Sequence, residues 1–507
     1  MAQQISITGL ASNNVTPGTY VEEIFGMGDL SGDSTTRKIL VLGQQISGSA
    51  GVHNTIYGPD TQTAVTNVND VKTLCGVGSE LAVCYEMVAK TSAGVNQIYI
   101  GIEPLATGNV ATKTITFTGT ATAVSSVKLY MGEKSVEVPI AVGDTPTVLS
   151  GKCIIAINAL QTLVVASGTT TVVLTYRHIG IRGNLFTVYA TISSSCGVTS
   201  DTSTVARLAS GTGTPALATL ITAMETGKYD YIQACDSYDD AAATTLLKAS
   251  VLASAGPMVD RRQRLFLGWG NNYSDLANRT SWVSALNSER VEILSQHDSM
   301  YIPGLLAAQL VGIVSQYESQ TVPRCNFNNF GALGQESAYW LIREPHWNSK
   351  PTSAQITNDL NLGVTPVACT NGGNTVLVKR VTSRYILTGT TTDYRIREPH
   401  KVCVTDKFVN DIQAILRALM QGKMIGADPP AGSQYVPNTI TPRMIRAKFA
   451  YLLTQYKEDV LLENIKNTLD TLIIQRSTVN QSRFEFRCNL DVADICDQIV
   501  GVIGQVG

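Results

Sequence analysis

The chain has 507 residues, of which 44% are hydrophobic and 15% are charged. This length predicts about three or four domains, each with enough apolar residues for a core of its own. The formal net charge of −2 argues against a nucleic-acid-binding protein, which would need a basic surface. The sequence has no apolar run of about eighteen residues and no signal-peptide pattern, so neither membrane insertion nor export through a cleaved leader is expected.

The ten cysteines are scattered along the chain and contain no CxxC pair. Cys75 and Cys84 share a helical pattern at a spacing that suits neither zinc nor a redox pair. The cysteines are therefore predicted to be free, buried thiols of a protein that is assembled in a reducing cytosol.

The first residues are small and polar, and residues 1–25 are predicted to form an extended arm. A Pro-Gly turn at Pro17 and Gly18 precedes a short alternating strand over residues 19–24. Fully extended, this segment would reach roughly 80 Å at about 3.3 Å per residue, farther than the width of a typical domain. We therefore expect it to contact a neighbouring subunit through Pro17, Gly18, Tyr20, Val21 and Ile24.

Residues 26–105 are predicted to be the first half of a central α/β domain. Residues 38–43 form a buried strand that enters a glycine-rich loop, which lacks the GxGxxG and GK[ST] spacing of phosphate-binding loops. A helix over residues 70–91 is broken at 75–80, where Ser79 is a good N-cap for its second part. A strand over residues 96–103 completes an α/β layer.

Residues 106–205 are rich in Thr, Val and Gly and poor in charge, which predicts an inserted β-rich domain. We expect one helix in it, over residues 148–167. The helix–strand alternation resumes in residues 206–350, with strands expected at 229–235, 264–269 and 291–295. This segment is therefore predicted to be the second half of the central domain.

Residues 351–490 are predicted to form a C-terminal α+β domain. The sequence from Asn371 to Asn374, Asn-Gly-Gly-Asn, lies between two apolar runs and indicates a hairpin. Of two amphipathic helices, the first is expected to start at Thr405 or Asp406 and to end at Gly422. The second has Thr441 as N-cap and Pro442 as first residue, and a strand follows at 472–475. The sheet of this domain is the expected acceptor for strands of other subunits.

The last part of the sequence alternates apolar and polar residues over 483–490, which predicts a strand with one buried face. A turn or short helix then leads, within a C-terminal arm of residues 491–507, to a second apolar run. This run either completes the chain's own sheet or is donated to a neighbouring copy. The second reading predicts subunit contacts at Phe484, Phe486, Ile499, Val500, Val502, Ile503 and Val506.

Features that could support catalysis are weak. The five histidines have neither metal-ligand spacing nor a neighbouring nucleophile motif; they are His53, His178, His297, His346 and His400. Asp236, Asp239 and Asp240 follow a strand, where an α/β active site would lie, but helix capping is the better explanation. Arg261, Arg262 and Arg264 are expected in solvated or intersubunit ion pairs. The sequence therefore predicts no enzyme, with no catalytic, cofactor-binding or metal site.

Four short motifs, in this order, resemble a known family. They are the Pro-Gly-Thr-Tyr-Val-Glu arm at 17–22, the Leu-Cys-Gly-Val-Gly-Ser-Glu-Leu-Ala stretch at 74–82, Gly-Val-Thr-Pro at 363–366 and Ile-Thr-Pro-Arg at 440–443. The family is that of contractile tail sheath proteins of Mu-like bacteriophages. Cys75 replaces the aromatic residue usual in the second motif. In the family, the hairpin that starts with Gly-Val-Thr-Pro ends in Arg-x-x-Thr-x-Tyr, and residues 382–385 match this ending only in part.

The resemblance implies an α+β multidomain fold whose C-terminal domain exchanges strands with neighbouring subunits. It implies a structural subunit of a phage tail in the virion, assembled in the host cytoplasm as hexameric rings stacked around a tail tube. The implied partners are copies of the chain, the tube protein, and baseplate and tail terminator proteins, with no direct nucleic-acid contact, membrane insertion or cofactor. Contraction of this cylinder would drive the tube through the host envelope.

Three alternatives remain open from the sequence. The chain could belong to a phage-derived contractile injection device instead of a virion. It could also be an α/β enzyme with an accessory β-domain, or an adhesin or shell protein that binds a ligand through the inserted domain.

Overall fold

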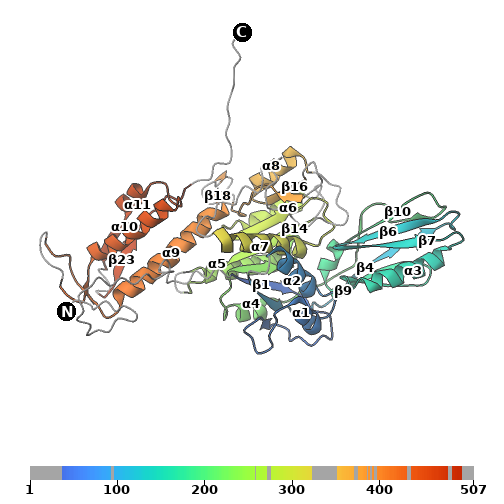
Figure 1. Cartoon of the computed structure of the whole chain (residues 1–507), viewed down its shortest axis with the longest axis horizontal. Helices are drawn as coiled ribbons and strands as arrows, with labels where there is room; N and C mark the ends of the chain where they lie inside the picture. The colour runs from blue at the N-terminus through green and yellow to red at the C-terminus, as the bar shows by residue number, and fades with distance from the viewer. Residues whose placement is uncertain are drawn as a thin grey trace, which may run out of the picture.

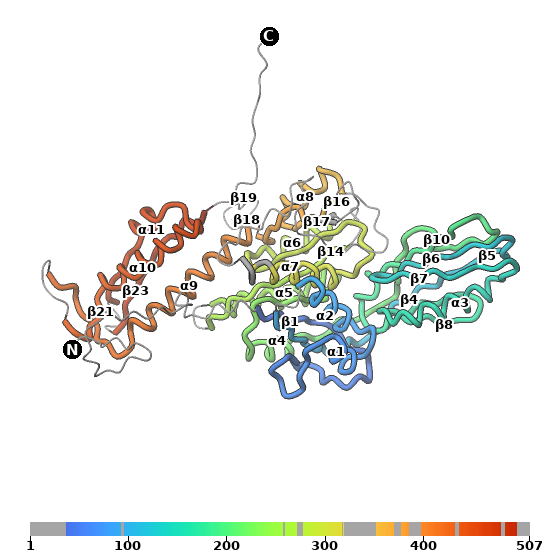
Figure 2. The backbone as a smooth tube through the Cα atoms, in the orientation of Figure 1, coloured from blue at the N-terminus to red at the C-terminus, as the bar shows by residue number. Residues whose placement is uncertain are grey.

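The computed structural model describes residues 37–92, 96–256, 259–270, 276–321, 351–369, 375–384, 386–388, 391–392, 397–430, 436–477 and 482–493. Three parts lie in a row along the long axis of the molecule (Figure 1). The central unit is an eight-stranded sheet with its helices, the inserted unit comprises residues 110–207, and the C-terminal unit comprises residues 399–493. The backbone runs from the central unit out to the inserted unit and back, so the two are joined by adjacent chain segments (Figure 2).

The central sheet has the strand order β17-β16-β15-β14-β13-β1-β3-β2. Its inner strands are parallel, and only the edge strands β2 and β17 run antiparallel to their neighbours. The strands are β1 (Lys38–Gly43), β2 (Ile56–Tyr57), β3 (Gln97–Ile102), β13 (Tyr231–Ala234), β14 (Arg264–Trp269), β15 (Val291–Ser295), β16 (Thr365–Cys369) and β17 (Thr375–Leu377).

Helices cover both faces of this sheet. Alternate residues of β1 contribute to two separate cores, Ile39 and Val41 to one and Leu40 and Leu42 to the other. A strand buried on both faces must be apolar throughout, which explains the unbroken Ile-Leu-Val-Leu run. The helices are α1 (Val68–Cys75), α2 (Glu80–Thr91), α4 (Ala218–Met224), α5 (Ala241–Ser254), α6 (Leu276–Leu286), α7 (Pro303–Thr321) and α8 (Ser353–Leu362), with a short 3-10 turn η2 (Tyr238–Asp240) before α5.

The predicted break in the first long helix is confirmed. Helix α1 ends at Cys75 and α2 begins at Glu80, with Gly76 and Gly78 at positive φ between them. The side chain of Ser79 accepts a hydrogen bond from the backbone N–H of Ala82 at 3.1 Å, as expected of an N-cap. The α/β layer predicted for the central unit is therefore present.

The strands of the inserted unit form small sheets of their own, with orders β12-β10-β6-β7, β4-β9-β8 and β11-β5. Helix α3 (Pro146–Ala159) packs against several of these strands. The other elements are β4 (Val110–Ile115), β5 (Phe117–Thr118), β6 (Ser125–Met131), β7 (Lys134–Ile140), β8 (Val164–Ser167), β9 (Val172–Ile179), the 3-10 turn η1 (Ile181–Leu185), β10 (Thr187–Ile192), β11 (Thr199–Ser200) and β12 (Ala206–Arg207).

The expectation that α3 continues to Ser167 is wrong. The helix ends at Ala159, and Gln161 has a φ of 52°, which a continuing helix does not allow. Residues 164–167 instead form β8. The backbone N–H and carbonyl of Ala166 each form a hydrogen bond of 2.8 Å with the side-chain amide of Asn158. Buried and exposed residues alternate in β8, as is typical of a strand, but the sequence prediction assigned these residues to the helix.

The hairpin predicted for the C-terminal domain belongs to the central sheet. Its two arms pair as expected, with Val367 opposite Leu377, although the turn at residues 371–374 lies outside the described residues. Strand β16 pairs in parallel with β15 through Leu294 and Thr365. The assignment of this hairpin to the sheet of the C-terminal domain is therefore wrong.

The C-terminal unit is built on the helices α9 (Pro399–Met420) and α10 (Pro442–Glu458), with α11 (Ile465–Thr471) beside them. Short two-stranded ladders accompany the helices. They are β20 (Met424–Ile425) with β21 (Thr439–Ile440), and β22 (Ile473–Arg476) with β23 (Phe484–Arg487); β18 (Ile386–Thr388) pairs with β19 (Thr391–Thr392) before α9.

The predicted start of the first C-terminal helix is wrong and that of the second is confirmed. Helix α9 begins at Pro399, whose fixed φ suits the first helical turn, and Asp406 lies inside the helix rather than capping it. In α10, the side chain of Thr441 accepts from the backbone N–H of Met444 at 3.4 Å and Pro442 follows it.

We expect Thr441→Ala to destabilise α10 by about 1 kcal/mol, because the capping bond is lost. Amide hydrogen exchange should show about fivefold lower protection in the first turns of α10. Thr454→Ala, at an exposed position of the same helix, is the matched control and should leave the protection equal or higher because alanine favours helix. Equal effects of the two variants would contradict a capping role for Thr441.

Among the described residues, no helix has both the length and the apolar content needed to cross a bilayer.

Candidate functional site

The C-terminal unit has an aromatic core that joins its helices to the strand β23. The ring of Phe408 in α9 lies 5.4 Å from that of Tyr456 and 6.3 Å from that of Phe449, both in α10. Phe449 in turn contacts Phe486 of β23 edge-to-face at 5.0 Å. These contacts hold the strand against the helix pair.

Strand β23 pairs with β22 in register, with Ile474 opposite Phe486. In the part of the chain that the structure describes, this sheet has two strands. Ile473 is 57% exposed and Phe486 is 48% exposed although both are large apolar side chains. A two-stranded sheet is marginally stable by itself and presents edges to which further strands can be added.

The structure describes two of the twelve residues predicted to contact a neighbouring subunit. Phe484 and Phe486 lie on β23, where Phe484 is partly buried against the C-terminal core. The other ten predicted contacts lie outside the described residues: Pro17, Gly18, Tyr20, Val21, Ile24, Ile499, Val500, Val502, Ile503 and Val506. Contact of all twelve with a second subunit stays a prediction.

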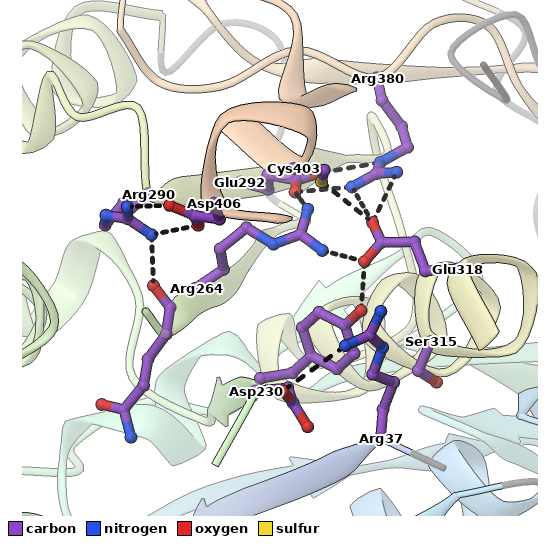
Figure 3. Close-up of polar contacts among 12 residues, drawn as sticks. Arg37, Asp230, Arg264, Arg290, Glu292, Ser315, Glu318, Arg380, Cys403 and Asp406 are labelled. Carbon is purple, nitrogen blue, oxygen red and sulfur yellow. Dashed lines mark hydrogen bonds and ion pairs between the residues drawn. The ribbon is translucent and has the colours of Figure 1, made fainter. Parts of the chain in front are cut away.

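A partly buried polar junction connects the C-terminal helix α9 to the central sheet (Figure 3). Arg290, just before β15, donates two hydrogen bonds of 2.8 and 2.7 Å to the carboxylate of Asp406 on α9. This paired geometry fixes both the distance and the orientation of the two side chains. Asp406 therefore anchors α9 to the sheet, a role that the sequence prediction of an N-cap missed.

Beside this pair, two arginines and two glutamates form a charge-balanced cluster (Figure 3). Arg380 donates to Glu292 at 2.8 and 2.7 Å, and Arg264 donates to the same carboxylate at 3.0 Å. Glu318 of α7 accepts from Arg264 and from the hydroxyl of Tyr231, and lies 3.4 Å from Arg380. The sulfur of Cys403 on α9 lies 3.7 Å from Glu318.

The charges of this cluster hold Glu318 in its ionised form. Burial alone would raise the pKa of Glu318, but Arg264 and Arg380 lower it to about 2. Arg264 is therefore in a buried ion pair within its own chain, not in the solvated or intersubunit pair that the sequence suggested. The four charged side chains are at most 6% exposed, and their geometry suits a rigid connection between strands of the central sheet and α7.

A second polar cluster occupies the carboxyl ends of β1, β3 and β13, where parallel α/β sheets usually bind ligands. Here Arg182, from η1 of the inserted unit, contacts Glu80, Glu103 and Asp236. Asp240 caps α5 by accepting from the N–H of Ala243 at 3.0 Å, as predicted. The chain's own arginine thus fills the position where the sequence allowed an active site.

The described histidines serve structural contacts. His178 Nε2 accepts from the backbone N–H of Glu80 at 3.0 Å, and its Nδ1 lies 3.2 Å from the carbonyl of Gln45. His297 contacts Asp359 at 2.9 Å, and His400 contacts the carbonyl of Ala493 at 3.0 Å. His53 Nδ1 lies 2.8 Å from the carbonyl of Glu103, and His346 lies outside the described residues.

The cysteines in the described part of the chain are free. Cys84 and Cys235 meet in the core with their sulfurs 3.5 Å apart, and burial raises the pKa of Cys75 to about 12. Over the same described residues, no three His, Cys, Asp or Glu side chains are grouped as metal ligands would be.

Sequence comparison gives the chain a relative of known type. The Mu-like prophage FluMu tail sheath protein of Haemophilus influenzae is 25% identical over 319 residues, which are 61% of this chain and 62% of that protein. The chain has a homologue among Mu-like tail sheath proteins. The family resemblance predicted from the short motifs is thereby confirmed, although the match spans less than two thirds of the relative's length.

No family model matches the chain. Among solved structures, the sheath tail protein from Listeria innocua is similar at 12% identity, over 91% of this chain and 92% of that chain, with a TM-score of 0.47. The helical sheath of the anti-feeding prophage in its contracted state is similar at 10% identity, over 97% and 99% of the two chains, with a TM-score of 0.45.

Proposed function

We propose that this chain is a structural subunit of the contractile tail sheath of a bacteriophage. It polymerises as hexameric rings that stack around an inner tail tube, and contraction of the cylinder drives the tube through the host envelope. The observation that carries the proposal is the match to a protein named as a Mu-like prophage tail sheath protein. The same assembly and contraction would serve a phage-derived injection device, which is the alternative function.

The proposed mechanism is strand exchange between copies of the chain. The arms of residues 1–25 and 491–507 would each pair with the β22–β23 sheet of a neighbour. Exposed apolar side chains on this sheet, Ile473 and Phe486, support the proposal because an added strand would cover them. A head-to-tail contact of this kind does not close on itself and so propagates into a helix.

The remaining parts of the proposal concern partners and catalysis. The inner tube protein, the baseplate and the tail terminator would contact the assembled sheath, in the virion and after assembly in the host cytoplasm. The hypothesis of an enzyme is weaker, because Arg182 and its three carboxylate partners fill the edge of the sheet where parallel α/β enzymes usually bind ligands.

Negative-stain imaging of the purified protein tests the proposal. A sheath subunit should form rings or long cylinders, since its arms join successive copies. A small closed oligomer or a monomer at all concentrations would refute it.

A charge on the proposed acceptor sheet should block assembly. We expect Ile473→Lys to shorten or abolish polymers while changing the stability of the monomer by less than about 0.5 kcal/mol, since the side chain is exposed. Val502→Asp, in the proposed donor arm, should act alike. Lys457→Ile, a change of matched size on the exposed surface of α10, is the control and should assemble normally. Normal polymers of Ile473→Lys in sedimentation velocity would contradict the assignment of this sheet.

A further inference from the structure

A single buried arginine of the inserted unit contacts three carboxylates of the central unit, in addition to the apolar core that the two units share and the hydrogen bond from Thr187 Oγ1 to the carbonyl of Met300. The guanidinium of Arg182 lies 2.8 Å from Glu80 and 2.6 Å from Glu103, and it also contacts Asp236. All three carboxylate side chains are 0% exposed. They come from three elements of the central unit, namely the start of α2, the residue after β3 and the loop after β13. Withdrawing the inserted unit would therefore remove the only cation that these salt bridges share.

The charges of this cluster do not balance. One guanidinium faces three carboxylates here. The cluster of Arg264, Arg380, Glu292 and Glu318 in Figure 3, by contrast, has two arginines and two glutamates. Full ionisation would leave two excess negative charges in a buried site, which is costly. Burial, together with the neighbouring carboxylates, raises the pKa of Glu103 and Asp236, which favours the retention of a proton by the pair.

The other titratable groups around Arg182 are accounted for. Glu80 has a lowered pKa because Arg182, His178 and hydrogen bonds outweigh its burial, and it stays ionised. The hydroxyl of Tyr176 donates to Glu80 at 3.0 Å, and burial keeps it protonated by raising its pKa. Burial lowers the pKa of His178, which is neutral. Cys235 is a thiol with a raised pKa, Asp239 has its pKa raised to about 7 by burial, and Asp240 caps α5.

We propose that the contact of Arg182 with Glu80, Glu103 and Asp236 is a proton-controlled latch, which fastens the inserted unit to the central sheet and loosens as the pH rises above neutral. The latch is closed while Glu103 and Asp236 share a proton, because Arg182 and that proton together offset two of the three buried negative charges. Loss of the proton leaves the excess charge inside and favours separation into water. The latch operates within one chain, so it does not depend on the sheath assignment.

The pH window follows from which state binds more protons. A carboxyl group whose pKa is raised in the closed state stabilises that state below its ordinary pKa of about 4, and this stability is lost as the pH rises through the raised value. His178 acts in the opposite direction, but only below its ordinary pKa of about 6.5, where the open state takes up a proton. Above pH 6.5 the carboxyl groups dominate: the pair of Glu103 and Asp236, and Asp239, whose raised pKa of about 7 acts in the same direction. Opening should then become about tenfold more favourable per pH unit for each retained proton.

Amide hydrogen exchange of the full chain between pH 6.5 and 8.5 tests the latch. After correction for intrinsic exchange, protection of residues 176–187 should fall about tenfold per pH unit in the unmodified protein. Glu103→Gln and Asp236→Asn each remove one negative charge without a change of shape, so the pH dependence of the protection should become clearly weaker in both, with Asp239 contributing what remains. Two variants are used so that the test survives if one of them fails to fold.

Asp144→Asn is the matched control. Asp144 pairs with Lys152 inside the inserted unit, away from Arg182, so this variant should keep the full pH dependence. Protection that is independent of pH in the unmodified protein would overturn the latch. A pH dependence that is undiminished in Glu103→Gln or Asp236→Asn, or that disappears in Asp144→Asn, would also overturn it.

Discussion

Replacing Arg380 by methionine is expected to destabilise the chain by about 3–5 kcal/mol, because the change strands two buried carboxylates. Glu292 would lose two of its three hydrogen bonds from arginine, and Glu318 would lose Arg380 while it keeps Arg264, Tyr231 and the thiol of Cys403. Methionine fills a similar volume, so loss of charge rather than loss of packing would dominate. Urea denaturation, followed by circular dichroism, measures the change in the free energy of unfolding.

Arg417→Met is the matched control for Arg380→Met. Arg417 lies on α9 with its side chain 73% exposed, and its ion pair with Asp260 spans 3.4 Å. Exposed pairs contribute about 0–1 kcal/mol, so this variant should be close to the unmodified protein. Adding Glu292→Gln to Arg380→Met should recover part of the loss, since it removes one unpaired charge. Equal stabilities of Arg380→Met and Arg417→Met would contradict the structural importance of the cluster.

Deleting residues 1–24 is expected to abolish polymerisation and to leave a folded, soluble monomer. The described central, inserted and C-terminal units each have a core composed of later residues, so the deletion should remove a connection between subunits and not a part of the fold. Sedimentation velocity should show a single small species in place of polymers. Thermal unfolding should show an unchanged midpoint.

Two outcomes would contradict the arm assignment. A lower unfolding midpoint would mean that residues 1–24 stabilise their own subunit. Polymers of normal length would mean that other contacts hold the assembly together. A deletion of the same arm combined with Val502→Asp should resemble the single deletion, because assembly is already lost.

The C-terminal unit and the inserted unit are attached to the central sheet by contacts that differ in their response to pH. The cluster of Arg264, Arg380, Glu292 and Glu318 is balanced in charge and joins the strands of the central sheet to α7, and the pair of Arg290 and Asp406 beside it holds α9 to the sheet. The cluster around Arg182 carries an excess of carboxylates and responds to pH near neutrality. If the subunit moves during contraction, we therefore expect the C-terminal unit to stay attached to the sheet while the inserted unit is free to shift.

Local patterns predicted many elements correctly because local interactions decide them. The apolar run of β1, the break between α1 and α2, and the N-caps at Ser79 and Thr441 each depend on residues a few positions apart. The order of short motifs also indicated a resemblance to tail sheath proteins, and the chain is similar to one of them, at 25% identity. The overextended α3 shows the limit of this approach, since an apolar stretch can continue from a helix into a strand.

The sequence by itself determined where the chain makes strands and helices, the family it resembles and the low surface charge that argues against nucleic-acid binding. Only the tertiary structure decided that β16 and β17 complete the central sheet, because strand pairing joins segments that no local period relates. Only the tertiary structure brought Arg182 to Glu80, Glu103 and Asp236, and Arg380 to Glu292 and Glu318. A charged residue in an apolar run signals a partner but does not identify it, because the free energy of burying a charge depends on distant residues that folding brings within hydrogen-bonding distance.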